Sequence, residues 1–135
     1  MIGGYLMEEK KEEKTEEVPV LSPPVVLQKL PGAPTQQMIE QWKTVHGEVY
    51  MLALSEKEVF IWRPITRPEY LQVQQTVQNQ SQYEELICDV CTLWRSVDAD
   101  WQKGKAGTPA TLHEQILLQS NFVNANAASL LVARL

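Results

Sequence analysis

The sequence predicts a small α+β domain: an antiparallel β-hairpin packed by several helices, with an extended Pro-rich N-terminal arm. Segment 48–70, EVYMLALSEKEVFIWRPITRPEY, contains two strand-like runs separated by a short polar turn. Amphipathic helical patterns precede and follow this segment. Residues 18–34 combine prolines with apolar side chains. We therefore expect a charged flexible tail at 1–17, the arm at 18–34 and a single domain at 35–135.

Composition limits the classes of protein to consider. The chain has 135 residues and a formal net charge of −5. We expect neither nucleic acid nor membrane as a partner, because both attract basic surfaces. No apolar run reaches the ~18–20 residues that a bilayer span requires. The two cysteines lie three positions apart, which excludes a disulfide framework and favours a reducing cytoplasm.

The first 17 residues hold six glutamates and three lysines. Such a segment has too few apolar side chains to form a core, so we expect a solvated tail. The alternative is an acidic segment that docks on a basic neighbour.

Five of the eight prolines fall in residues 18–34, VPVLSPPVVLQKLPGAP. Because proline fixes φ and lacks an amide donor, we expect neither a helix nor a central strand here. The segment is too apolar for a simple spacer, so we expect an extended arm laid along a groove. The groove belongs either to the same domain or to a neighbouring subunit. The arm residues expected to bind a partner are Val20, Leu21, Val25, Val26, Leu27 and Leu30.

The domain begins with a helix expected over residues 36–46, capped by Thr35 and ended by Gly47 in a left-handed turn. Its apolar residues recur at the spacing of one helical face. The hairpin follows, with strands at 49–54 and 59–62 joined by a polar four-residue loop.

Three later helices are expected to start at capping-box pairs. These pairs are Thr66 with Glu69, Ser81 with Glu84, and Thr111 with Glu114. The first helix should reach about Asn79. The second should run through Trp94, because apolar residues keep to one face from Tyr83 onward, and it is the best candidate to cover the hairpin. A polar loop over 95–107 follows. Residues 122–135 suggest a last helix, buried by its own domain or by a partner.

Cys88 and Cys91 have the CxxC spacing, but they fall in the middle of a predicted helix. A redox site favours a helix N-terminus, where the dipole lowers the thiol pKa. A zinc site needs two further ligands, and the only histidines, His46 and His113, are isolated. Ordinary buried cysteines are therefore expected, and thiol or zinc chemistry is the alternative.

Two arginines, Arg63 and Arg67, flank the exit of the hairpin. They bind a carboxylate on a partner, or they pair with Glu69 and solvent. Asp98 and Asp100 share a polar loop with lysines, which indicates a solvated loop or a cation site. No glycine-rich phosphate loop or nucleophile elbow is present, so we expect no catalytic residues and no cofactor.

Two stretches resemble small tail proteins of tailed bacteriophages. The first is QMIEQWKTVHGEVYMLALSEKEVFIWRPITRPEYLQV, where a Trp-Lys helix ending in Gly leads into a hairpin, an Arg-Pro corner and a Glu-Tyr helix. The second is CTLWRSVDADWQKGKAGTPATLHEQILLQSNF, with a Cys-x-Leu-aromatic helix end, a loop and a Thr-Leu helix start. Both fall within residues 37–122, and neither includes the Pro-rich arm. The shared motifs are structural rather than catalytic.

The resemblance implies a structural component of a phage tail, at the baseplate or tail hub, that acts by protein–protein contacts in virion assembly. Its partners would be other tail or baseplate proteins, or copies of itself. It would lie in the virion tail, and in the host cytoplasm during assembly. The same family includes cytoplasmic tail-assembly chaperones that are not retained in the virion, which is the alternative. A thiol or zinc protein using Cys88 and Cys91 is the second alternative.

Overall fold

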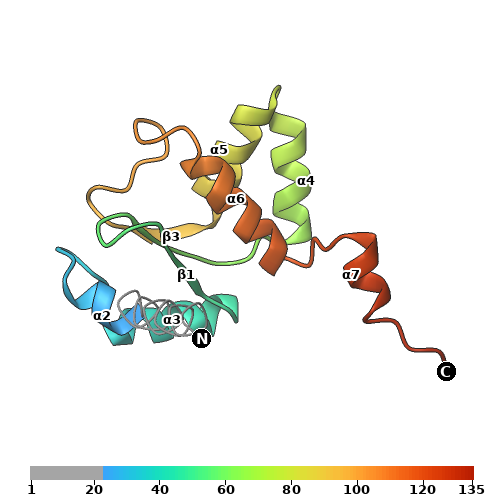
Figure 1. Cartoon of the computed structure of the whole chain (residues 1–135), viewed down its shortest axis with the longest axis horizontal. Coiled ribbons are helices and arrows are strands. Elements are labelled where there is room, and N and C mark those ends of the chain that lie inside the picture. Colours follow the sequence, from blue (N-terminus) through green and yellow to red (C-terminus); the bar gives the residue numbers. More distant parts are fainter. Residues whose placement is uncertain (1–22) are drawn as a thin grey trace, which may run out of the picture.

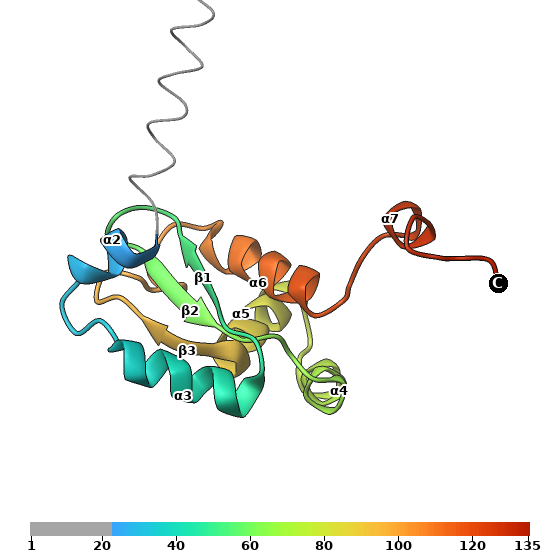
Figure 2. The same ribbon diagram turned by 90° about the horizontal axis from the view of Figure 1, so that it is seen from below.

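The computed structural model describes residues 23–135, and it has the α+β architecture that the sequence predicts. Six helices and a three-stranded antiparallel sheet make up this part of the chain (Figure 1). In chain order these elements are α2 (Pro23–Gln28), α3 (Gln36–His46), β1 (Tyr50–Ala53), β2 (Val59–Trp62), α4 (Arg67–Thr76), α5 (Gln80–Cys91), β3 (Thr92–Arg95), α6 (Thr108–Gln119) and α7 (Ala125–Ser129). Helices α2 and α3 lie on one side of the sheet, and α5 and α6 lie on the other (Figures 1 and 2).

Strands β1 and β2 form the predicted hairpin, with Tyr50 opposite Trp62. The loop between them is closed by the amide of Leu54, which donates to the carbonyl of Glu58 at 2.9 Å. The hydroxyl of Ser55 accepts the amide of Glu58 at 3.1 Å. The hydroxyl of Ser96, which follows β3 in the sheet, donates to the carbonyl of Lys57 at 2.6 Å, so the loop is held by its own backbone groups and by one distant residue.

Strand β3 is the main departure from the prediction. The helix expected to run through Trp94 ends at Cys91, and residues 92–95 pair with β2 instead. Trp94 lies opposite Ile61, and a register shift leaves Leu93 without an opposite residue. The second edge of β2 offers backbone partners to a Thr-Leu-Trp run whose side chains favour strands. The helical spacing continues to Trp94 by coincidence, and periodicity alone cannot separate the two states.

The hydrophobic core lies between the sheet and the α5–α6 pair. Every residue of β2 is buried, so both faces of this central strand are covered. Phe60 and Trp62 join α5 and α6 in one cluster, whose helical members include Ile87, Cys88, Cys91, Leu112 and Ile116. The prediction that α5 covers the hairpin is therefore confirmed.

The predicted starts of α3 and α4 and the predicted end of α3 are confirmed. The hydroxyl of Thr35 accepts the amide of Met38 at 3.1 Å at the start of α3. Gly47 ends this helix with the expected positive φ of 85°, although its ψ of −51° lies outside the left-handed helical region. At α4, Thr66 and Glu69 form the predicted reciprocal capping box.

The predicted start of α5 at Ser81 and Glu84 is wrong. Asn79 caps this helix, and its side chain accepts the amide of Gln82 at 2.9 Å. Asn79 must be extended to do so, and α4 accordingly ends at Thr76 rather than at about Asn79. Asparagine is as good a cap as serine, and here the earlier residue is used.

The predicted start of α6 at Thr111 is also wrong. The helix begins at Thr108, with Pro109 in its first turn, and no side chain caps it. Proline suits this place because the first amides of a helix lack intrahelical partners anyway. His113 and Glu114 consequently lie inside the helix, so Glu114 is not a capping residue.

The arm is only partly extended, which corrects the prediction for residues 18–34. Residues 23–28 form the short helix α2. Pro23 and Pro24 occupy its first turn, where a missing N–H does no harm, and the next proline is Pro31. The predicted tail at 1–17 and the first part of the arm lie outside the described residues.

The C-terminal segment, residues 122–135, is helical only over α7. The exposed fractions of Leu130, Leu131 and Val132 are 86%, 79% and 76%. The segment projects away from the sheet and from the other helices in both views (Figures 1 and 2). A last helix is thus confirmed in part, and the fold itself does not bury it.

Candidate partner-binding site

The second half of the arm is docked on its own domain. Val26 is 2% exposed, and Pro34 is also buried. The indole N–H of Trp94 donates to the carbonyl of Gly32 at 3.1 Å, which ties the arm to β3. Of the two grooves that the sequence allowed, residues 26–34 therefore use the one on their own domain. Val20 and Leu21 lie outside the described residues, and Val25 belongs to α2.

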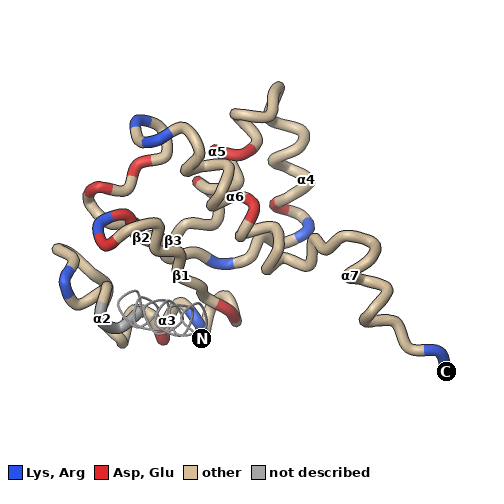
Figure 3. The backbone as a smooth tube through the Cα atoms, in the orientation of Figure 1, with Lys and Arg blue, Asp and Glu red and all other residues tan. Residues whose placement is uncertain are grey.

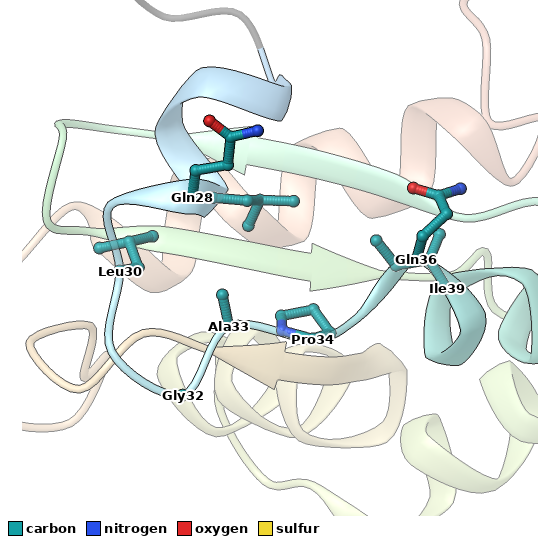
Figure 4. A pocket seen from close by; sticks show the side chains of 8 residues that line it. Gln28, Leu30, Gly32, Ala33, Pro34, Gln36 and Ile39 are labelled. Atoms are coloured by element: carbon teal, nitrogen blue, oxygen red, sulfur yellow. The ribbon is translucent and has the colours of Figure 1, made fainter.

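A groove of about 530 Å³ opens between α2 and α3 (Figure 4). Its walls are Leu27, Gln28, Leu30, Gly32, Ala33, Pro34, Gln36 and Ile39. Gly32 has a φ of 70°, so the chain turns sharply at the bottom of the groove. Leu27 and Leu30 are half-buried. An apolar wall with amide side chains near it is typical of a surface that binds a peptide or another protein.

Arg63 is held inside the domain rather than offered to a partner. Its guanidinium donates to both carboxylate oxygens of Glu69, at 2.6 and 2.9 Å. It also donates to the carbonyls of Pro64 and Val90, each at 3.1 Å. Its side chain is 12% exposed. Of the two alternatives that the sequence allowed for Arg63, the structure shows the pairing with Glu69. Through Glu69 and Val90, Arg63 joins the hairpin exit to α4 and α5.

This pair shifts the ionisation of both groups. The Arg63 guanidinium, with help from the capping contacts of Thr66, lowers the pKa of Glu69 to about 2. The same hydrogen bond raises the pKa of Arg63 above its ordinary value. Both groups are therefore charged at any ordinary pH. Arg67, by contrast, is exposed and lies 5.9 Å from the ring centre of Tyr70.

Cys88 and Cys91 are fully buried in the core as free thiols. Burial raises the pKa of each thiol to about 12. The Cys88 thiol lies 3.5 Å from the carbonyl of Pro109. Nucleophilic attack and metal ligation both use the thiolate, so this environment disfavours either role. Within residues 23–135, no group of three or more His, Cys, Asp or Glu side chains could hold a metal.

The polar loop after β3 is organised by its own backbone. The carboxylate of Asp100 accepts the amides of Gln102 and Lys103, at 2.9 and 3.3 Å. These bonds lower the pKa of Asp100. Trp101 packs on Phe60, with ring centres 5.8 Å apart. The solvated-loop interpretation therefore accounts for this segment without a cation.

Sequence reasoning missed a second groove, which lies beside β3. It measures about 410 Å³ and is lined by Asp89, Thr92, Leu93, Trp94, Arg95 and Trp101. The sequence offered no signal for it, because the expected helix through Trp94 would have left no strand edge there. Trp94 lines this groove and also binds Gly32 of the arm, whereas neither Arg63 nor Arg67 lines it.

Comparison with protein-family models, with curated proteins and with solved structures finds no match to this chain. Among residues 23–135, no helix combines the length and apolar character that crossing a membrane requires. The class defined by the fold is a small α+β domain with a three-stranded antiparallel sheet between helices.

Proposed function

We propose that this chain is a non-enzymatic structural component of a bacteriophage tail, at the baseplate or tail hub. It acts through protein–protein contacts during virion assembly. The observation that carries the proposal is the apolar surface at two ends of the molecule. One end is the groove between α2 and α3, and the other is the C-terminal segment 122–135.

The amount of exposed apolar surface supports a role in assembly. Single exposed hydrophobic residues are normal, whereas a contiguous run is not. In the run from Leu130 to Leu135, four of six side chains are large, apolar and more than three-quarters exposed. Surfaces of this kind are typically covered by another protein.

The residues that resemble phage tail proteins support the proposal in a different way. Gly47 ends α3, the Arg63–Glu69 pair fixes the hairpin exit, and Pro68 lies in the first turn of α4. These residues build the scaffold rather than a catalytic site. A resemblance through them is therefore a resemblance of architecture, consistent with a structural subunit.

The α2–α3 groove offers a direct test in a phage that encodes this chain. Leu30→Asp places a charge in the groove wall, and we expect loss of complete tails, counted by electron microscopy. The matched control is Lys29→Asp, at the exposed neighbouring residue, which should leave the tails intact. Thermal melting of both purified variants shows whether each still folds. Normal tails with folded Leu30→Asp protein would contradict the role of the groove.

A further inference from the structure

One face of the sheet is covered by the first helices of the described chain. In β2, Phe60 and Trp62 join the core with α5 and α6, so Val59 and Ile61, which alternate with them, point to the opposite face. The exposed fractions of Val59 and Ile61 are only 0% and 2%. The described elements on this side of the sheet are α2 and α3 (Figure 2). We call residues 23–46, which include both helices, the cover segment.

Few specific contacts hold the cover segment to the rest of the domain. Among the described residues, one hydrogen bond joins it to residues 48–135, from the indole N–H of Trp94 to the carbonyl of Gly32. Its charged residues, all exposed, are Lys29, Glu40 and Lys43 (Figure 3). Within the described chain, no ion pair crosses this boundary. Val26 and Pro34 are buried, whereas no residue of α3 is. The cover segment is therefore a separable layer, and its removal would expose the apolar face beneath it.

A hinge of three residues, 47–49, connects the cover segment to β1. Gly47 in this hinge has a φ of 85° and a ψ of −51°. These angles are close to those of a γ-turn with positive φ, which is a rare conformation. Glycine adopts it at a cost in conformational entropy. A short hinge in a restricted conformation favours exchange of a segment between copies, because opening the hinge releases the restriction while the other copy restores the contacts.

We propose that two copies of this chain exchange their cover segments, so that residues 23–46 of each copy cover the sheet of the other. A second copy is the occupant that fits this face, because it supplies the same side chains, including the partners of the Trp94–Gly32 hydrogen bond. An opened chain without a partner would expose Val59 and Ile61 to water, so opening and dimerisation are coupled. Each copy gives and receives the same segment, which produces a two-fold symmetric dimer.

This inference goes beyond the proposed function and does not depend on it. All eight residues that line the α2–α3 groove lie within 27–39, so the groove belongs to the cover segment. Its walls move together, whether the segment covers its own sheet or that of another copy. Leu30→Asp therefore tests the role of the groove, whereas changes in the hinge test the exchange.

Hinge variants measure the exchange directly. Each chain is unfolded in urea, refolded over a concentration series and examined by sedimentation velocity. The wild type should form a dimer at high concentration. Gly47→Ala should lower the dissociation constant of the dimer by roughly tenfold or more, because alanine is strained at this positive φ only in the closed hinge. Inserting Gly-Ser-Gly-Ser after Glu48 should give monomers, because a longer hinge closes without restriction.

The matched control for the hinge is Gly107→Ala. Gly107 has a φ of −84° and lies outside the hinge, so this variant should associate like the wild type. Circular dichroism of each variant checks that the fold is intact. A wild type that stays monomeric at every concentration would overturn the proposal. So would an insertion variant that dimerises as strongly as the wild type, because its dimer would not depend on the hinge.

An isotope-filtered nuclear Overhauser experiment identifies which chain supplies the cover. Isotope-labelled and unlabelled wild-type chains are refolded together at a concentration that gives dimers. Exchanged dimers should show a contact from the indole proton of Trp94 on the labelled chain to the α-protons of Gly32 on the unlabelled chain. Two closed chains that associate through another surface would show this contact only within one chain. That result would overturn the exchange even though a dimer forms.

Discussion

Glu69 has two structural roles at once. It completes the capping box of α4 with Thr66, and it binds the guanidinium of Arg63 from the hairpin exit. The first role follows from sequence, because a capping box is defined by local spacing. The second does not, because the distance between Arg63 and Glu69 depends on how the chain turns at Pro64. For that reason the sequence left the partner of Arg63 open.

The pair makes stability dependent on pH. The pKa of Glu69 is about 2 in the fold, against an ordinary value of 4.5. A lowered carboxyl pKa stabilises the fold above pH 4.5, and this stabilisation is lost as pH falls toward 2. Because Glu69 is one-third exposed, we expect a loss of about 1–2 kcal/mol in the free energy of unfolding.

Urea denaturation between pH 2 and 6 measures this loss, and Arg63→Met should flatten the profile. The control is Glu40→Gln, which removes an exposed pair with Lys43 and should cost less than about 0.5 kcal/mol. If the stability of Arg63→Met fell with pH as steeply as that of the wild type, the Arg63–Glu69 pair would not be the source of the pH dependence.

The two thiols should be inert in the native protein. Burial raises the pKa of Cys88 and of Cys91 to about 12, so almost no thiolate is present at pH 8. We expect a disulfide reagent to label neither cysteine within minutes under native conditions and both in urea. Absorbance of the released thiol measures the rate. Fast native labelling would reopen the thiol alternative.

Among the elements, the sequence predicts best those with one strong local signal. The α3 and α4 caps are each fixed by residues within a few positions, and so are the bonds of Leu54 and Ser55 that close the hairpin loop. The prediction fails where two signals compete. Asn79 and Ser81 are both good caps, and Thr92–Trp94 continue a helical spacing while having strand-forming side chains. Residues 92–94 form a strand because they pair with β2, and a pattern of neighbouring residues cannot predict a pairing between distant segments.

The two turns at Gly47 and Gly107 form a matched pair for testing backbone conformation. Gly47 has a φ of 85°, whereas Gly107 has a φ of −84°, and an added Cβ would meet no atom within 4 Å at either. Gly47→Ala should therefore cost about 1–2 kcal/mol from conformational strain alone. Gly107→Ala should be near neutral or slightly stabilising. Equal effects in urea denaturation would contradict this assignment.

The pairing of β3 with β2 predicts specific nuclear Overhauser effects. Backbone protons of Ile61 and Trp94 should show cross-strand contacts, and residues 92–95 should have strand-type chemical shifts. Helical shifts through Trp94 would contradict the strand and restore the periodic interpretation.

At the scale of the whole molecule, the helices cover both faces of the sheet but leave apolar surface at two ends. Part of the candidate site was predictable: Leu27 and Leu30, named from the sequence, line the α2–α3 groove. Arg63 is not available to a partner, because its guanidinium binds both carboxylate oxygens of Glu69 within the domain. The groove beside β3 could not be predicted from the sequence, because it forms only when β3 pairs with β2.

The central claim is that this chain is a subunit of the phage tail. Mass spectrometry of purified particles, from a phage that encodes this chain, tests it most directly. Isotope-labelled reference peptides give the number of copies per particle. We expect a fixed copy number in purified virions and in isolated tails. A chain that is abundant in the infected-cell lysate but absent from particles would contradict the claim and indicate a tail-assembly chaperone.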